Sequence, residues 1–327
     1  MAEIEKLRSR LASTGSYPPV PPDWGADFTK ITRTDTYDYI DPETRSDCTG
    51  KAVLITGGTK GIGLGIAVSY ARAGASQIAI TSRSVTHDGV ITAVAQIRKA
   101  GMESKRSGQI GPKVLAIALD VKDITSVKQA ARTLEAKFGR LDVLIENAGF
   151  LARYENILDG DEDEWWESFD VNLRGGYLVA KAFLPLLLRD ENATEGCRVG
   201  DKTVIFISST GALHFHPGGS AYQISKFALL RLVEFLLSEY SNQGLLAYSV
   251  HPGGVATDLA SRLPQRTQSW LKCTPALGGD TIAFLTSSRQ EWLAGRYLTA
   301  MWDMSEFFSK KAEIIDKDLL KMRMTFS

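Results

Sequence analysis

The stretch Ala52-Val-Leu-Ile-Thr-Gly-Gly-Thr-Lys-Gly-Ile-Gly63 joins a short apolar segment to a glycine-rich turn and to the start of a helix. An apolar strand that runs into such a turn brings unpaired backbone N–H groups and the positive end of a helix dipole to one point. That arrangement binds phosphate, and glycine is needed because a Cβ would block close approach. The spacing predicts a dinucleotide site, with a merely tight strand-to-helix turn as the alternative, and it lacks the GKS or GKT of a P-loop nucleotidase.

Beyond this stretch, short apolar segments alternate with segments of helical periodicity. Such alternation predicts right-handed βαβ units and a parallel sheet that is covered on both faces. The predicted fold class is therefore α/β, a doubly wound, Rossmann-like parallel sheet in a single domain. The predicted strands are Ala52–Thr56, Gln77–Ser82, Val114–Leu119, Leu141–Glu146, Thr203–Ser208, Leu245–Val250 and Tyr297–Trp302. The predicted helices are Gly63–Ala73, Val90–Lys99, Ile124–Phe138, Trp165–Leu188, Tyr222–Tyr240 and Met304–Met324.

Residues 1–49 are predicted to be an N-terminal extension, and residues 50–327 the nucleotide-binding domain. The extension starts with a segment of helical pattern, Glu3–Leu11, and prolines 18, 19, 21 and 22 forbid helix after it. We interpret the extension as a surface strap or lead-in, with a regulatory or partner-binding arm as the alternative. Two polar segments, Gly101–Lys113 and Arg189–Lys202, are predicted to be surface loops.

The composition excludes several classes of protein. The chain has 327 residues, 44% of them hydrophobic and 23% charged, with a formal net charge of +0. We therefore expect no nucleic-acid partner. The longest apolar run is too short to span a bilayer, and the charged N-terminus does not match a secretory signal. The 3 cysteines do not pair by spacing and four zinc ligands are lacking, so we expect a cytoplasmic protein without a metal.

The end of the second predicted strand indicates which dinucleotide is bound. An NAD enzyme usually presents an acidic side chain there to the adenosine ribose. This chain instead has Ser82 followed by Arg83. An arginine can hold a 2′-phosphate, and Lys60 in the glycine turn supplies a second cation. The cofactor is therefore predicted to be NADP(H); the alternative is that both cations are simply solvated at the surface.

A tyrosine and a lysine lie one helical turn apart in Tyr222-Gln-Ile-Ser-Lys226. A phenol ordinarily has a pKa of about 10, and a nearby ammonium would lower that pKa. Ser209 follows an apolar strand, at the edge where open α/β sheets bind their ligands, and its hydroxyl can donate to a substrate oxygen. The tyrosine–lysine pair alone is a weak signal, since helices often contain it by accident.

Taken together, these motifs resemble the short-chain dehydrogenase/reductase family, in its compact single-domain branch. The matching residues occur in family order over roughly residues 50–302: Thr56-Gly57-x-x-x-Gly61-Ile62-Gly63, Asp120-Val121, Asn147-Ala148-Gly149, Asn172, Ser209, Tyr222-x-x-x-Lys226 and Pro252-Gly253-x-x-x-Thr257. One position departs from the pattern, because Glu146 replaces the first asparagine of the family's NNAG motif. We expect altered hydrogen bonding at that strand end rather than lost activity.

The resemblance implies a role for each matching residue. Tyr222 would be the general acid in reduction, Lys226 would lower its pKa and bind the nicotinamide ribose, and Ser209 would hold the substrate oxygen. Asn172 would anchor the water of a proton relay. The implied cofactor-binding residues are Gly57, Thr59, Lys60, Gly61, Ile62, Gly63, Ser82, Arg83, Asp120, Val121, Asn147, Ala148, Gly149, Tyr222, Lys226, Pro252, Gly253, Val255 and Thr257.

The implied activity is transfer of a hydride between NADP(H) and a carbonyl or secondary alcohol. Residues 256–275 match the family's substrate lid, and its apolar residues, such as Leu259 and Trp270, suit a fairly apolar ketone unless they pack into the core. The extension and the closing helix are similar to fungal members linked to secondary metabolism, and a homodimer or homotetramer is expected by analogy. The alternatives are enoyl or imine reduction, epimerisation, and a non-catalytic NADP-binding protein.

Overall fold

A seven-stranded, all-parallel sheet with the strand order β3-β2-β1-β4-β5-β6-β7 organises the chain. The structure, a computed structural model, describes residues 25–106, 111–189 and 201–324. The strands are β1 (Ala52–Ile55), β2 (Gln77–Ser82), β3 (Lys113–Ala118), β4 (Val143–Glu146), β5 (Thr203–Ile207), β6 (Leu246–His251) and β7 (Tyr297–Thr299). This arrangement confirms the predicted doubly wound α/β fold in a single domain.

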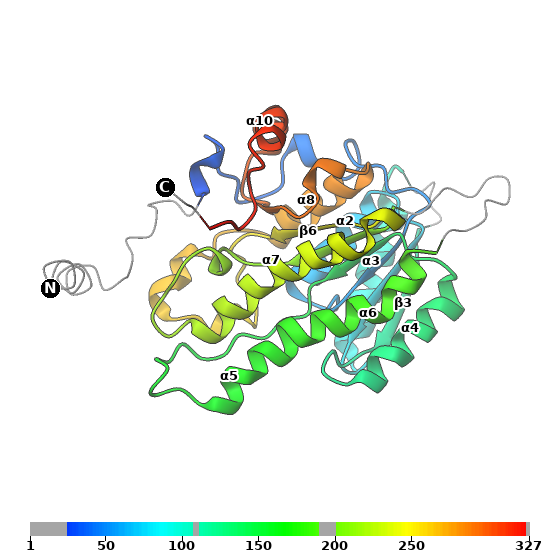
Figure 1. Ribbon diagram of the computed structural model, residues 1–327. Helices are drawn as coiled ribbons and strands as arrows, with labels where there is room; N and C mark the ends of the chain where they lie inside the picture. The colour runs from blue at the N-terminus through cyan, green and yellow to red at the C-terminus, as the bar shows by residue number, and fades with distance from the viewer. Residues whose placement is uncertain (1–24, 107–110, 190–200, 325–327) are drawn as a thin grey trace, which may run out of the picture.

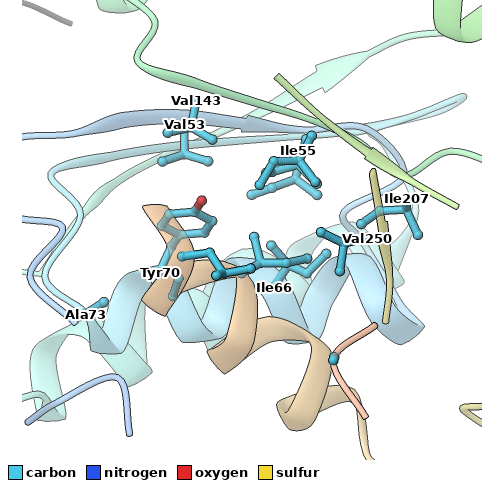
Figure 2. Close-up of a cluster of buried hydrophobic side chains, with 14 of the residues drawn as sticks. Val53, Ile55, Ile66, Tyr70, Ala73, Val143, Ile207 and Val250 are labelled. Carbon is cyan, nitrogen blue, oxygen red and sulfur yellow. The ribbon is translucent and has the colours of Figure 1, made fainter. Parts of the chain in front are cut away.

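Helices cover both faces of the sheet (Figure 1), and each layer encloses its own apolar core. Figure 2 shows Ile66 and Tyr70 directed toward Val53, Ile55 and Val143 of the strands, and all five side chains are fully buried. Their burial is the main stabilising contribution in this layer. The helices of this layer are α2 (Gly61–Arg72), α3 (Asp88–Glu103) and α8 (Pro275–Ser287). The opposite layer contains α4 (Ile124–Phe138), α6 (Gly176–Leu187) and α7 (Ser220–Tyr240).

The strand order fixes where a ligand can bind. From β1 the chain runs outward to β2 and β3 and then returns to the other side of β1 as β4. The connections after β1 and β4 therefore diverge, and open α/β sheets bind ligands in the crevice at such a point, outside the carboxyl ends of the strands. The glycine turn follows β1, and Asn147 follows β4.

Residues 25–50, called the strap below, lie against α8 and α9 (Met304–Ser309). Arg33 forms an ion pair with Asp303, with 2.7 Å between Nη2 and Oδ2. The Thr36 hydroxyl donates to Asp280 Oδ2 over 2.5 Å, and Ile40 is fully buried in the core. The strap is thus packed onto the domain. The predicted helix Glu3–Leu11 lies outside the described residues.

One predicted helix contains an irregular turn, and another is wrong in its extent. The predicted helix Trp165–Leu188 is divided into α5 (Glu162–Phe169), a π-helical turn (Asp170–Gly175) and α6. Gly175 in this turn packs closely on Val121, because a Cβ there would lie 2.7 Å from Cγ2 of Val121. The π-helical turn depends on this tertiary contact, which the periodicity of apolar residues along the sequence does not reveal.

The predicted closing helix Met304–Met324 is also divided. It consists of α9 and α10 (Lys311–Asp316), with Lys310 between them. Asp318 and Leu320 have φ angles of 46° and 66°, which end the helical path. Within the described chain, no helix is long and apolar enough to cross a bilayer.

The remaining differences concern α8 and the loops. Helix α8 is missing from the predicted elements because nearly all of it is buried, so it has no amphipathic stripe. Its Gly279 allows close packing on α2, where a Cβ would lie 2.4 Å from the Ser69 hydroxyl oxygen. In the predicted loops, α3 continues to Glu103, while residues 107–110 and 190–200 lie outside the described residues.

Candidate active site

The glycine turn between β1 and α2 is shaped for close approach by a ligand. Gly57 and Gly61 have φ angles of 62° and 54°, and a Cβ on Gly63 would lie 2.4 Å from the carbonyl oxygen of Gly57. Helix α2 has no acidic residue in its first turn and no side-chain cap from Lys60, its N-cap residue. Its first N–H groups are therefore open to an anion, and the turn fits the pyrophosphate of a dinucleotide.

Side-chain hydrogen bonds join the ends of β1 and β4 across the crevice. Asn147 Nδ2 donates to the carbonyl oxygen of Thr56 over 2.8 Å. The Thr56 hydroxyl oxygen accepts from the backbone N–H groups of Asn147 at 2.8 Å and Ala148 at 2.9 Å. Thr56 thus fixes the geometry of both predicted cofactor-binding segments. Its position directly before the glycine turn was the available signal for this role.

The two predicted phosphate-binding cations differ in their surroundings. Arg83 follows β2 and is exposed, whereas Ser82 beside it is partly buried. Lys60 forms an ion pair with Asp258 of the lid, with 2.6 Å between Nζ and Oδ2, and both side chains are largely exposed. An exposed pair of this kind is weak, so Lys60 can exchange Asp258 for another anion.

The residues after β3 lie on the same edge of the sheet. Asp120 Oδ1 accepts from the N–H of Lys122 over 3.0 Å, which fixes the turn, and Val121 is buried against Gly175.

The segment after β6 reaches back to the glycine turn. Gly253 has a φ angle of 100°, and a Cβ on it would lie 2.9 Å from the Cys273 sulfur. Val255 forms a β-bridge with Cys273. A Cβ on Gly61 would lie 3.1 Å from the methyl carbon of Thr257. These contacts place the predicted Pro252–Thr257 segment beside the start of α2.

The structure brings Ser209, Tyr222 and Lys226 together at the ends of β5 and α7. The Ser209 hydroxyl caps a 3-10 turn by accepting from the N–H of Gly211 over 3.0 Å. A side-chain hydrogen bond joins Ser209 to Tyr222. Lys226 Nζ donates to the carbonyl oxygen of Ile207 over 2.8 Å and lies 5.8 Å from the centre of the Tyr222 ring.

Asn172 is fully buried in the π-helical turn, where its side chain has three hydrogen bonds. Its Oδ1 accepts from the N–H of Phe150 over 2.8 Å, and its Nδ2 donates to the Phe150 carbonyl oxygen over 2.9 Å. Nδ2 also donates to the Ser225 hydroxyl over 2.9 Å. Asn172 therefore ties the segment after β4 to the helix of Tyr222 and Lys226. Ser225 was not predicted, although its place between those two residues was a usable signal.

The pKa of the Tyr222 phenol is shifted upward. Burial raises this pKa, and the hydrogen bond with Ser209 lowers it in part. The net direction is opposite to the predicted lowering by Lys226, because burial is the largest cause of the shift and Lys226 is not among its causes. The phenol therefore remains protonated at neutral pH and can act as a proton donor.

A carboxyl group lies beneath this site. Glu146, at the end of β4, is fully buried, and its Oε1 accepts from the Thr56 hydroxyl over 3.2 Å. Burial raises the pKa of Glu146 to about 7, against the opposing effects of the Lys226 ammonium and of the Thr56 hydrogen bond. Burial likewise lowers the pKa of Lys226 to about 8, and the negative charge of Glu146 opposes that shift.

The predicted lid, residues 256–275, contains two short 3-10 helices, Ala260–Arg262 and Gln265–Trp270. Arg262 Nη1 donates to the carbonyl oxygen of Leu151 over 3.1 Å, and its guanidinium carbon lies 4.9 Å from the centre of the Phe150 ring. The Trp270 side chain is 50% exposed and lies beside His216, with 5.7 Å between ring centres. Trp270 is therefore not part of the apolar core.

Comparison with known proteins agrees with this geometry. The family model described as short chain dehydrogenase matches residues 51–268. The chain belongs to the short-chain dehydrogenase/reductase family. Its relatives include the short chain dehydrogenase mpl6 of Monascus purpureus, 43% identical over 93% of this chain and 98% of the relative. Another is the short chain dehydrogenase pigC of Monascus ruber, 41% identical over 92% and 94%.

Solved structures of short-chain dehydrogenases share the fold of this one. A putative short chain dehydrogenase from Pseudomonas syringae has a TM-score of 0.66 and 26% identity, and the match covers 83% of this chain and 99% of that one. Another neighbour, from Shigella flexneri, was solved with NADP; its TM-score is 0.64, its identity 24%, and the match covers 79% and 99%. An NADH-dependent reductase with a TM-score of 0.62 and 23% identity was solved with NAD; that match covers 77% and 95%. These likenesses show that the short-chain dehydrogenase shares its fold with all three solved structures.

In this short-chain dehydrogenase, three further buried polar groups, His214, Gln223 and His251, lie near the site. Gln223 Nε2 and His214 Nδ1 are 3.1 Å apart, and Gln223 Oε1 accepts from the N–H of His216 over 2.9 Å. Burial lowers the pKa of His214 to about 4, and that of His251 also to about 4, so both imidazoles are neutral at pH 7. No group of three or more His, Cys, Asp or Glu side chains suited to a metal occurs among the residues described.

Proposed function

We propose that this short-chain dehydrogenase is an NADP(H)-dependent carbonyl reductase. The observation that carries the proposal is the half-buried, protonated Tyr222 beside Ser209, with Lys226 on the same helix. Because the Tyr222 phenol is protonated at neutral pH, it can supply the proton that the substrate oxygen must gain in reduction. The presence of Ser209, Tyr222 and Lys226 together favours carbonyl chemistry over enoyl or imine reduction and over epimerisation. It also favours an enzyme over a protein that only binds the cofactor.

In this mechanism the substrate oxygen lies between the hydroxyls of Ser209 and Tyr222. Ser209 holds the oxygen by a hydrogen bond, and Tyr222 transfers its phenolic proton to it. Lys226 then stabilises the phenolate by its positive charge. Asn172, through its bonds to Phe150 and Ser225, holds the surrounding backbone in place for reprotonation from solvent.

The residues present fit NADP(H). The glycine turn would hold the pyrophosphate, Arg83 and Lys60 the 2′-phosphate, and Asp120 with Val121 the adenine. Asn147, Gly149, Lys226, Val255 and Thr257 would line the nicotinamide half. When bound, the cofactor supplies the hydride, and the protein supplies orientation and the proton. The absence of an acidic side chain at Ser82 supports NADP(H) over NAD(H).

The surroundings of the site suggest its substrate and setting. Trp270 is half-exposed and Phe215 is 62% exposed, so aromatic surface is available near the site for a fairly apolar ketone. Trp166, Tyr177, Ile224, Phe227 and Phe235 are exposed on α5, α6 and α7, which supports a homodimer or homotetramer. The Monascus relatives support a fungal setting for this enzyme. We propose that it acts in secondary metabolism and in the cytoplasm.

A panel of ketones, followed by NADPH absorbance and repeated with NADH, tests this function. We expect at least one apolar ketone to be reduced, with NADPH preferred. Tyr222→Phe should lower kcat by about 10²–10⁴-fold, the contribution of a general acid, with little change in NADPH affinity. Equal turnover by the wild type and Tyr222→Phe would refute the mechanism, and a preference for NADH would refute the cofactor assignment.

A further inference from the structure

Glu146 occupies a position that is costly for a carboxylate. It is fully buried, and among the described residues only one of its two oxygens has a hydrogen-bond partner, the Thr56 hydroxyl. A Cβ on Gly176 would lie 3.7 Å from the Glu146 carboxyl carbon, so the backbone of α6 closes the space beside it. A buried charge of this kind requires a compensating partner.

The topology brings the ammonium of Lys226 into the same buried region as this carboxyl group, where the two charges interact without a direct ion pair. Glu146 is paired in register with Phe206 of β5, and Lys226 Nζ binds the carbonyl oxygen of the next residue, Ile207. Gly149, three positions after Glu146, packs against the same ammonium, because a Cβ on Gly149 would lie 3.7 Å from Nζ of Lys226. The carboxyl group and the ammonium are therefore enclosed together by β4, β5, α6 and α7.

Few other charges act on this pair. From α7 the neighbouring titratable group is Tyr222, which is protonated at neutral pH. From β4 the neighbouring titratable group is Glu146. Among the described residues, no other charged group contributes to the shift in the Lys226 pKa. From β1 the neighbour is Thr56, which is neutral.

We infer that Glu146 is a positioning residue whose carboxylate keeps Lys226 protonated and directed to the active site. This inference rests on the proposed function, in which Lys226 binds the nicotinamide ribose. A glutamine could accept the same hydrogen bond from Thr56, but it would bring no charge. The carboxylate therefore extends cofactor binding and catalysis to higher pH than an uncharged residue would allow.

The test is the affinity for NADPH from pH 6.5 to 10, measured by the fluorescence of the bound nucleotide. In the wild type the affinity should fall at alkaline pH as Lys226 loses its proton. In Glu146→Gln, which keeps the shape but not the charge, this fall should move to lower pH by about one unit or more. At pH 8.5 the variant should then bind NADPH about tenfold more weakly than wild type, and at pH 6.5 within about threefold.

Matched variants separate the charge from folding effects. Asp280→Asn removes another buried carboxyl, in α8, and should leave the alkaline fall unchanged. Glu146→Asn provides a second neutral side chain in case Glu146→Gln does not fold. Lys226→Arg should abolish the fall, because a guanidinium stays charged throughout this range. If neither neutral variant folds, the test compares the pH dependence of NADPH affinity in the wild type and in Lys226→Arg. Identical alkaline falls in these two proteins would overturn the inference.

The same profiles distinguish this inference from the proposed function. An unchanged alkaline fall in Glu146→Gln would overturn the role of Glu146 even if a ketone is reduced. A shifted fall in a protein that reduces no carbonyl of the panel would uphold the pairing and refute the reductase assignment. Where a ketone is reduced, the alkaline limb of kcat should shift in the same direction as the affinity.

Discussion

The two edges of the active-site crevice are built by different means. The cofactor edge, Thr56–Gly63, is shaped mainly by backbone, with left-handed glycines and open N–H groups at the start of α2. The catalytic edge, around Asn172, Tyr222 and Lys226, is shaped by buried side chains bonded to backbone carbonyls and to one another. Binding at the cofactor edge should therefore be impaired by substitutions that add atoms. Function at the catalytic edge should be impaired by substitutions that remove them.

The largest effect should come from removing Asn172, which tests the catalytic edge. Asn172→Ala eliminates three hydrogen bonds and leaves the Phe150 backbone and Ser225 without these partners. We expect kcat for a reducible ketone to fall about 10²-fold, and the free energy of unfolding to fall by about 1–3 kcal/mol. NADPH affinity should change little.

Steady-state kinetics and denaturant unfolding check this prediction, with Asn156→Ala as the control because Asn156 is exposed. A kcat within threefold of wild type in Asn172→Ala would show that the catalytic edge does not depend on this side chain.

The next effect should come from adding one carbon to the cofactor edge. In Gly63→Ala the new Cβ would lie 2.4 Å from the Gly57 carbonyl oxygen and 2.6 Å from Asn147 Nδ2, so backbone has to move. Overpacking of this kind costs about 1–3 kcal/mol, which corresponds to an NADPH affinity about 10–100-fold lower.

Nucleotide titration measures this change, and Gly160→Ala is the control, since its Cβ would lie no closer than 3.4 Å to any neighbour. Unaltered NADPH binding by Gly63→Ala would mean that the turn is less rigid than its backbone contacts indicate.

The smallest of the three effects should come from pH, which acts on buried side chains but not on backbone. Burial, with a smaller effect of His214, lowers the pKa of His251 to about 4 from an ordinary value of 6.5. The neutral imidazole therefore contributes stability that is complete above pH 6.5 and is lost as the pH falls through 4. His251→Gln should reduce this acid-induced loss by on the order of 1–3 kcal/mol.

Thermal unfolding from pH 7.5 to 4.5 measures this slope. His87→Gln is the matched control, because His87 is exposed before α3. Equal slopes for the wild type and His251→Gln would count against a buried, neutral His251.

The sequence indicated the cofactor edge better than the catalytic edge. Strand β2 and helix α4 have the predicted bounds, and the glycine turn lies where a local motif placed it. These features depend on residues that are adjacent in sequence, so they can be predicted from the sequence without a structure. The position of Asn172 was predicted, but its π-helical turn was not, since that turn depends on packing between Gly175 and Val121.

The proposed role of Glu146 could likewise not be predicted from the sequence. Sequence comparison with the family pattern marked it as a departure, but the enclosure it shares with Lys226 arises from four separate elements of the fold. Helix α8 escaped prediction for a related reason, because a helix buried on several sides has no polar face to give it periodicity.

The strap has a consequence for exchanging parts between relatives. The carbonyl oxygen of Thr34 accepts from the N–H of Thr274 over 3.0 Å, and the Thr274 hydroxyl donates to Asp35 over 2.5 Å, so the strap holds the last residues of the lid. A chimera that receives a foreign lid without its own residues 32–36 would lose these bonds, and the graft would be anchored at one end only. Residues 32–36 and 256–275 are therefore best exchanged together, as two distant segments.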